Sequence, residues 1–131
     1  MFDICEEPLD IAPLIEAVSD PGHGAIVTFL GVVRKSGPAG PVSALEYSAY
    51  REMALVKLRE IGDELSARYG PMKIAAVHRV GKLDVGVASL ALAVGAPHRA
   101  EAWRASEEFV DRLKEIVPIW KKDVALEGGS A

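Results

Sequence analysis

The chain has 131 residues, of which 50% are hydrophobic and 26% are charged, and its formal net charge at pH 7 is -4. This length is typical of one domain, and the apolar content is enough for a compact core. The negative charge argues against a protein whose whole surface binds nucleic acid or anionic lipid. A local cluster of cations is therefore more informative here than on a basic chain.

The cysteine content and the N-terminal sequence indicate the compartment. Cys5 is the single cysteine, so an internal disulfide is not possible, which favours a reducing compartment. The acidic N-terminus lacks the basic start and apolar run of a signal peptide, and no apolar stretch reaches the about 18 residues that a membrane span needs. We therefore expect a cytoplasmic protein with a single domain over residues 1–131.

Short apolar segments alternate with turn signals in the first part of the chain. Residues 11–19 predict a short helix, and residues 24–34 predict a strand because they are β-branched and apolar. Gly31 inside that strand predicts a bulge or a close approach of another backbone. Residues 35–41, KSGPAGP, predict a mobile loop, and residues 42–49 predict a second strand.

Two long helices alternate with strands in the rest of the chain. Residues 50–69 and 98–117 predict the helices, since each carries an apolar stripe at helical spacing. Residues 73–80 and 87–95 predict strands, with residues 81–86 as the turn between them. A proline follows the last helix and cannot continue it, so the tail is expected to be extended. The predicted stripes are Ala54, Leu58, Ile61 and Leu65, then Ala102, Ala105, Phe109, Leu113 and Ile116.

This order of elements is typical of the α+β class, with a mixed or antiparallel sheet and helices packed on it. The sequence has no Cys/His spacing typical of zinc sites, no GxGxxG motif and no P-loop. We therefore expect neither a metal nor another cofactor.

Cations gather at the ends of predicted elements. Arg34 ends a strand beside the Gly/Pro loop. Arg99 follows His98 near a helix N-terminus, where backbone N–H groups favour an anion; the alternative is a solvated arginine beside a capping histidine. Lys114 lies in a last helical turn, where the dipole favours a lysine in any case. Lys121 lies on the extended tail, where one of two neighbouring lysines would face a cleft and the other would face water.

Together these residues predict an anion-binding cleft lined by Arg34, His98, Arg99, Lys114 and Lys121. Taken alone, the lysines have an ordinary explanation as surface charges. A cluster of cations without a serine or cysteine nucleophile suits an anionic substrate and stabilises developing negative charge.

Other candidates have structural explanations. His78 is expected at the edge of the core, hydrogen-bonded to backbone, and Tyr47 is expected to pack at a strand-to-helix junction. Cys5 lies in a polar stretch with no histidine nearby in the sequence, which argues against a catalytic thiol. Gly128-Gly129 is similar to the tail of ubiquitin-like proteins, but two further residues follow it, so that role is discounted.

Five collinear segments over residues 24–123 resemble the large subunit of molybdopterin synthase. They are GAIVTFLGVVR, LEYSAYREMA, IAAVHRVGKLDVG, the PHR after a strand, and LKEIVPIWKKD. The resemblance implies an α/β-hammerhead fold and cyclic pyranopterin monophosphate, also called precursor Z, as substrate. It further implies a small ubiquitin-like sulfur carrier whose C-terminal Gly-Gly ends in a thiocarboxylate. Two sulfurs would be delivered to make the dithiolene of molybdopterin, by a large-subunit homodimer with one carrier at each end, a heterotetramer.

The resemblance also implies a set of substrate-binding residues. Arg34, together with Val32 and Val33, matches the first substrate-binding segment of the family. His98 and Arg99 match the second segment.

The last matching segment supplies the expected catalytic groups. Lys114 matches a lysine near the carrier's tail, and Lys121, Lys122 and Asp123 match the final substrate-binding segment. Lys114 and Lys121 correspond to the catalytic lysines of the family. A lysine amine can move a proton to or from the pterin side chain.

Two other interpretations remain open from the residues. One is a catalytically silent pterin- or nucleotide-binding module of the same fold, against which the presence of both Lys114 and Lys121 argues. The other is a structural oligomer subunit, which would not need cations from three distant segments.

Overall fold

The computed structural model describes residues 1–37 and 40–125. Its helices are α1 (Ala12–Val18), α2 (Arg51–Tyr69) and α3 (Arg99–Ile116). Its strands are β1 (Phe2–Cys5), β2 (Ala25–Val32), β3 (Ser36–Gly37), β4 (Gly40–Ala49), β5 (Lys73–Arg79), β6 (Gly81–Asp84), β7 (Ala88–Ala96) and β8 (Ile119–Ala125).

The first sheet has the strand order β1-β5-β7-β2. β1 and β5 are parallel, whereas β5 with β7 and β7 with β2 are antiparallel. The register of β2 against β7 shifts between Gly31 and Val32, which confirms the bulge predicted at Gly31. β2 is the last strand of this sheet, so one side of its backbone lacks a neighbouring strand among the described residues.

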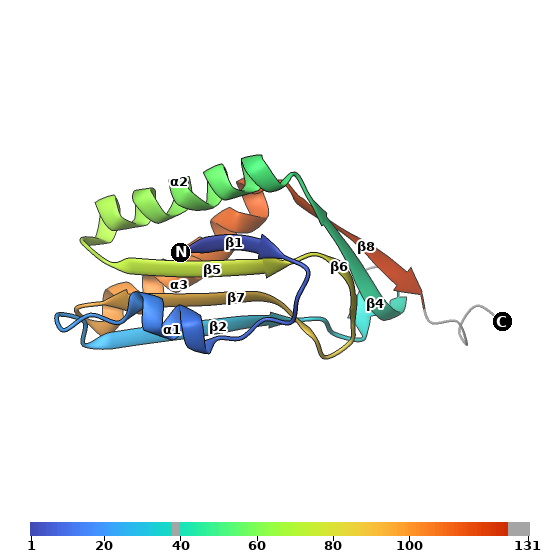
Figure 1. The fold of residues 1–131 in the computed structure, drawn as a ribbon, viewed down its shortest axis with the longest axis horizontal. Coiled ribbons are helices and arrows are strands. Elements are labelled where there is room, and N and C mark those ends of the chain that lie inside the picture. The colour runs from blue at the N-terminus through green and yellow to red at the C-terminus, as the bar shows by residue number, and fades with distance from the viewer. Residues whose placement is uncertain (38–39, 126–131) are drawn as a thin grey trace.

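The second sheet is built around β4. β3, β6 and β8 each pair with β4 in antiparallel orientation. This sheet lies next to the first sheet, beyond the C-terminal ends of β1, β2 and β5 (Figure 1). The mixed and antiparallel sheets with packed helices confirm the predicted α+β class.

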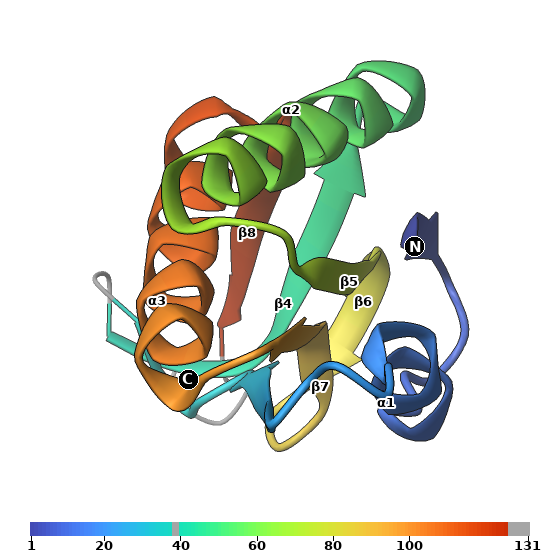
Figure 2. The same cartoon turned by 90° about the vertical axis from the view of Figure 1, so that its left-hand side faces the viewer.

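Helices cover both faces of the first sheet. α1 contacts β5 and β7 on one face, while α2 and α3 lie on the other (Figure 2). β7 therefore lies between two apolar clusters. Leu90, Leu92 and Val94 belong to the cluster under α2 and α3, and Ala91 and Ala93 to the cluster under α1.

The helical stripes have the burial that the sequence predicted. In α2 the four predicted residues are at most 1% exposed. In α3 the first four predicted residues are buried, and Ile116 packs half-buried against the same cluster. Phe109, at the middle of the stripe, stacks on Phe2 of β1 with ring centroids 6.0 Å apart.

Three short strands correct the sequence prediction. Residues 81–86 are not only a turn, because Gly81–Asp84 forms β6 against β4. The loop expected at residues 35–41 contains β3 and the start of β4, paired through Ser36 and Pro41. β1 was not predicted, because its few residues gain their hydrogen bonds from β5, which is distant in the sequence.

Within the described part of the chain, none of the helices combines the length and apolar character needed to cross a bilayer. Residues 38–39 of the expected loop, the end of the extended tail, and Gly128-Gly129 lie outside the described residues.

Candidate functional site

A cavity of about 570 Å³ opens between the two sheets beside the C-terminal end of α3. It draws residues from β2, β4, β5, β7, β8 and α3. Arg34, Lys114 and Lys121 line it, together with Asp123, whose carboxylate is the only one that the described residues contribute to the lining. Three of the five residues of the predicted anion-binding cleft are thus brought together in one chain.

The two lysines reach the cavity from different elements. Lys114 lies in the last turn of α3, which ends at Ile116 before Pro118. β8 then runs back along β4, with Lys121 directly opposite Tyr47. Side chains alternate along a strand, so Lys121 faces the cavity with Asp123, whereas Lys122 does not line it.

The segment after the bulge presents Arg34 to the cavity. The Val33 side chain is 2% exposed, and its backbone N–H donates to the Val87 carbonyl at 2.9 Å. The Val33 carbonyl in turn accepts a hydrogen bond from the Gly86 N–H at 2.8 Å. Arg34 therefore follows a residue whose backbone N–H and carbonyl are both hydrogen-bonded. Val32, on the other side of Val33, lines the cavity and is 50% exposed.

The cations of the cavity have no carboxylate partner among the described residues. Six ion pairs within 4.0 Å occur in that part of the chain, and none includes Arg34, Lys114 or Lys121. Asp123 shares the cavity without such a pair. Exposed cations without partners, gathered around a concave surface, suit an anionic ligand.

His98 and Arg99 do not reach this cavity within one chain. They lie at the start of α3, whereas Lys114 lies at its end. Fifteen residues of α-helix separate Arg99 from Lys114, which corresponds to about 22 Å. His98 is the N-cap residue of α3, as the alternative interpretation expected, but its side chain makes no capping hydrogen bond.

His78 and Tyr47 line the cavity as well, which the sequence did not predict. Their rings meet edge-on with centroids 4.9 Å apart. His78 Nδ1 lies 2.7 Å from the Arg79 carbonyl oxygen, which confirms the expected bond to backbone. The period of two in β5 places His78 on the face of Ile74 and Ala76, and this pattern was the available signal.

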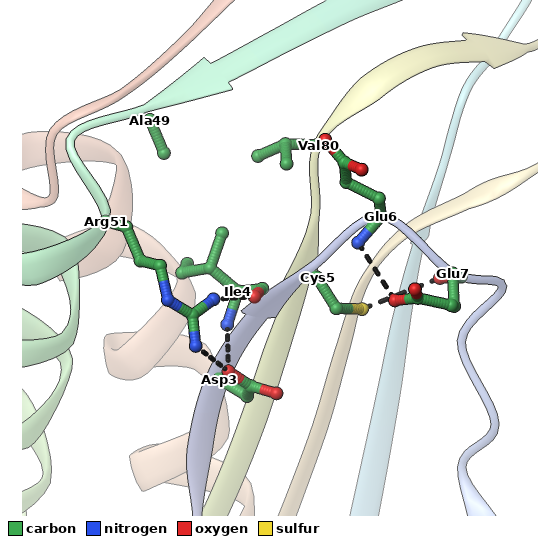
Figure 3. A pocket seen from close by; sticks show the side chains of 8 residues that line it. All are labelled: Asp3, Ile4, Cys5, Glu6, Glu7, Ala49, Arg51 and Val80. Carbon is green, nitrogen blue, oxygen red and sulfur yellow. Dashed lines mark hydrogen bonds and ion pairs between the residues drawn. The ribbon is translucent and has the colours of Figure 1, made fainter.

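A second cavity, of about 420 Å³, lies beside β1 and has the opposite charge character. Three carboxylates line it, those of Asp3, Glu6 and Glu7 (Figure 3). The Arg51 guanidinium is already engaged, because it donates to Asp3 Oδ1 at 2.9 Å and to the Ile4 carbonyl. This cavity is therefore unsuited to an anionic substrate.

Known proteins resemble the chain over nearly all of its length. The family model described as MoaE protein matches residues 4–116. The molybdopterin synthase catalytic subunit of Halalkalibacterium halodurans is 42% identical over 122 residues, covering 93% of this chain and 78% of that relative. The chain belongs to the MoaE family.

Other members of the MoaE family support the same assignment. The molybdopterin synthase catalytic subunit of Bacillus subtilis is 39% identical over 97% of this chain and 81% of its own length. The crystal structure of molybdopterin synthase from Staphylococcus aureus superposes with a TM-score of 0.92 at 39% identity, covering 97% of this chain and 93% of that one. The chain is accordingly an enzyme subunit of molybdopterin biosynthesis. A Helicobacter pylori complex of subunits 1 and 2 of molybdopterin-converting factor shares the fold, with a TM-score of 0.74 at 20% identity.

Proposed function

We propose that the chain transfers sulfur from the C-terminal thiocarboxylate of a small ubiquitin-like carrier to cyclic pyranopterin monophosphate, which forms the dithiolene of molybdopterin. The observation that carries the proposal is the convergence of Arg34, Lys114 and Lys121 on one cavity. The cyclic phosphate and the thiocarboxylate are both anions, so cations in a concave site, without a carboxylate partner among the described residues, complement them. Membership in the MoaE family supports the same reaction.

The two lysines are proposed to be the catalytic residues. Lys114 would lie nearer the acyl group of the carrier, where a cation stabilises the negative charge that develops on the acyl oxygen. Lys121 would lie nearer the pterin, where an amine can move a proton. The sulfur itself comes from the partner, because Cys5 lies beside the other, acidic cavity.

The binding residues are proposed to come from two copies of the chain. Val32 and Arg34 would bind substrate from one copy, with Val33 fixing the backbone and Asp123 lining the far wall. Because one chain keeps its own Arg99 far from its own cavity, a second copy is proposed to supply His98 and Arg99.

The edge strand β2 fits such a pairing. Ile26, Phe29, Leu30 and Val32 are 41%, 40%, 48% and 50% exposed along this edge. Apolar side chains on an unpaired edge favour association with another strand. A two-fold contact is self-complementary, so β2 would meet β2 of the second copy in antiparallel orientation.

This orientation would also complete the site. Ala25, at the start of β2, is paired with Ala96, three residues before Arg99. The end of β2 leads to Arg34. Antiparallel pairing sets the start of one β2 beside the end of the other, and so brings the second copy's Arg99 toward Arg34.

Reconstitution tests the proposed reaction. The purified chain is mixed with a thiocarboxylated carrier and cyclic pyranopterin monophosphate, and molybdopterin is measured as its oxidised fluorescent derivative. We expect product that depends on all three components. Tight binding of the pterin without any product in this mixture would instead support the catalytically silent binding module.

A further inference from the structure

His78 lines the cavity between the two sheets, and the reaction proposed above gives it no function. It lies near the end of β5 and is only 5% exposed. The ring of Tyr47 contacts it edge-on, and Tyr47 lies opposite Lys121 in the β4–β8 pair. Directly opposed residues on neighbouring strands face the same side, so Tyr47 and Lys121 face the cavity together, and His78 of the other sheet meets them through the Tyr47 ring.

The hydrogen bonds of His78 define which ring nitrogen is free. The Arg79 carbonyl oxygen can only accept, so Nδ1 at 2.7 Å must carry the hydrogen and donate it. In a neutral ring Nε2 then keeps its lone pair. Nε2 forms no hydrogen bond with another described residue, and among those residues no buried side-chain nitrogen or oxygen lacks a partner. Nε2 is therefore accessible, and it opens into the cavity that His78 lines.

The surroundings of His78 favour the neutral ring. Burial lowers its pKa below the ordinary value of 6.5, against a smaller opposing effect of the Arg79 carbonyl. The titratable and charged groups that share the cavity come from every wall: Tyr47 from β4, Arg34 after β2, Lys114 from α3, and Lys121 and Asp123 from β8. Arg79 donates its own Nε–H to the Glu6 carbonyl at 3.0 Å, outside the cavity.

Sulfur transfer, as proposed above, requires a base at one definite point. Once the carrier's sulfur is bonded to the pterin side chain, the acyl carbon must release it. Water supplies the oxygen: a C–O bond forms, the C–S bond breaks, and its electron pair leaves on the sulfur bound to the pterin. The attacking water must lose a proton, and a neutral acceptor takes it more readily than a protonated amine.

We propose that His78 is a further catalytic residue, the base that takes this proton on Nε2 during release of the carrier as a carboxylate. The Nδ1–H bond to Arg79 holds the ring in the tautomer that the step needs and stabilises the imidazolium that forms. Lys114 remains the cation at the acyl oxygen and Lys121 the amine that moves a proton at the pterin, so the proton transfers at the pterin and at the acyl carbon are divided between different side chains. This role rests on the proposed sulfur transfer.

A single-turnover experiment separates this role from a structural one. Wild type and His78→Gln are mixed with thiocarboxylated carrier and cyclic pyranopterin monophosphate at several pH values, and acid-quenched samples are analysed by mass spectrometry. Glutamine can hydrogen-bond in the cavity but does not take a proton. We expect product to form about 100-fold more slowly in the variant. The carrier–pterin thioester should accumulate, and the fall in rate that wild type shows at acid pH should disappear.

A matched control is available in His23, whose Nδ1 lies 2.9 Å from the Val18 carbonyl oxygen and which does not line the cavity. His23→Gln should keep the wild-type rate and pH profile. If His78→Gln does not fold, His78→Asn replaces it, since the asparagine amide can still donate to the Arg79 carbonyl, with the same expected results.

If the wild-type chain forms product, either of two results for the His78→Gln variant would overturn the proposed role of His78. One is a folded variant with the wild-type rate and acid limb. The other is a slowed variant in which no thioester accumulates. A wild-type chain that forms no product contradicts the proposed sulfur transfer itself, and the His78 role with it.

Discussion

Lys114 and Lys121 line one cavity although Pro118 lies between them and their elements differ. On a continuous helix a separation of seven residues would place them on one face. Here α3 ends at Ile116, and β8 returns along β4 in antiparallel orientation. The bend at the proline, rather than helical periodicity, therefore brings both amines to the cavity.

Replacing either cavity lysine with alanine should abolish most product formation. Each amine faces the space where the thiocarboxylate and the pterin would meet, and neither has a carboxylate partner within the described residues. Carrier affinity should change little, because one charge at the rim of a protein interface contributes little to binding. Single-turnover yield and calorimetric carrier affinity, measured on Lys114→Ala and Lys121→Ala, check both expectations.

Lys122→Ala is the matched control for Lys121→Ala. The two lysines are neighbours on β8, but only Lys121 lines the cavity, so Lys122→Ala should keep most of its yield. Lys121→Arg should rescue poorly, since arginine does not deprotonate in proteins. Near-normal yield from both cavity variants would show that these lysines are only surface charges.

Arg99→Ala should weaken binding of cyclic pyranopterin monophosphate by about 1.5–3 kcal/mol, the usual contribution of a hydrogen bond to a charged group. Folding should be unaffected, because Arg99 is exposed at the first position of α3. Arg104→Ala changes another exposed arginine of the same helix and should leave the affinity unchanged. Calorimetry measures the affinity of both variants for the pterin, and equal affinities would show that Arg99 does not bind it.

Mixed dimers test whether Arg99 acts across two copies. A dimer of one Arg99→Ala chain and one Lys114→Ala chain contains one intact site if the site is shared, and none if each chain builds its own. We expect the mixture, after subunit exchange, to form more product than either variant alone.

Light scattering should show a dimer, and a purely monomeric chain at micromolar concentration would contradict the pairing.

Sequence periodicity predicted the long elements because their burial is decided locally. The stripe from Ala54 to Leu65 is fixed by helical spacing, and it is buried as predicted. β1 and β6 could not be predicted in the same way. Each has four residues and pairs with a strand that is distant in the sequence, β1 with β5 and β6 with β4. β6 also begins at Gly81, in a segment that the sequence indicated as a turn.

Some residues of the site could likewise be predicted from the sequence, and others could not. Arg34, Lys114 and Lys121 could be predicted because cations at the ends of elements stand out in an acidic chain. For His78 the alternation in β5 predicts only the face on which it lies, and not the cavity there, since its neighbour Tyr47 belongs to the other sheet. Only the packing of the two sheets shows that the ring nitrogen opens into the cavity.

Gly95→Ala should destabilise the fold by about 1–3 kcal/mol, the usual cost of overpacking. An added Cβ would overlap the Val18 carbonyl oxygen at the end of α1 and approach His23 Nδ1 to 2.8 Å. At Gly22 the nearest atom is 3.4 Å away, on the flexible side chain of Asp20, so Gly22→Ala should change stability by less than about 0.5 kcal/mol. Denaturant unfolding of both variants measures the difference, and equal stabilities would contradict the close packing of α1 on β7.

His78 should also make stability depend on pH. Burial lowers its pKa in the folded chain below 6.5, so the unfolded chain takes up the proton first as the pH falls. The free energy of unfolding should therefore decrease below about pH 6.5 and stop decreasing once the pH is below the pKa of the folded chain. Denaturant unfolding of His78→Gln between about pH 7 and pH 5 should show a shallower decrease. A decrease equal to that of wild type would show that another group is responsible.

The origin of the sulfur tests the account most directly. The carrier is loaded with a heavy isotope of sulfur in its thiocarboxylate, one reaction is run with the purified chain and cyclic pyranopterin monophosphate, and the product is weighed by mass spectrometry. We predict that both dithiolene sulfurs carry the label and that no product forms when the carrier is left out. Product made without the carrier or another sulfur donor, or product whose sulfurs are unlabelled, would contradict the proposed transfer.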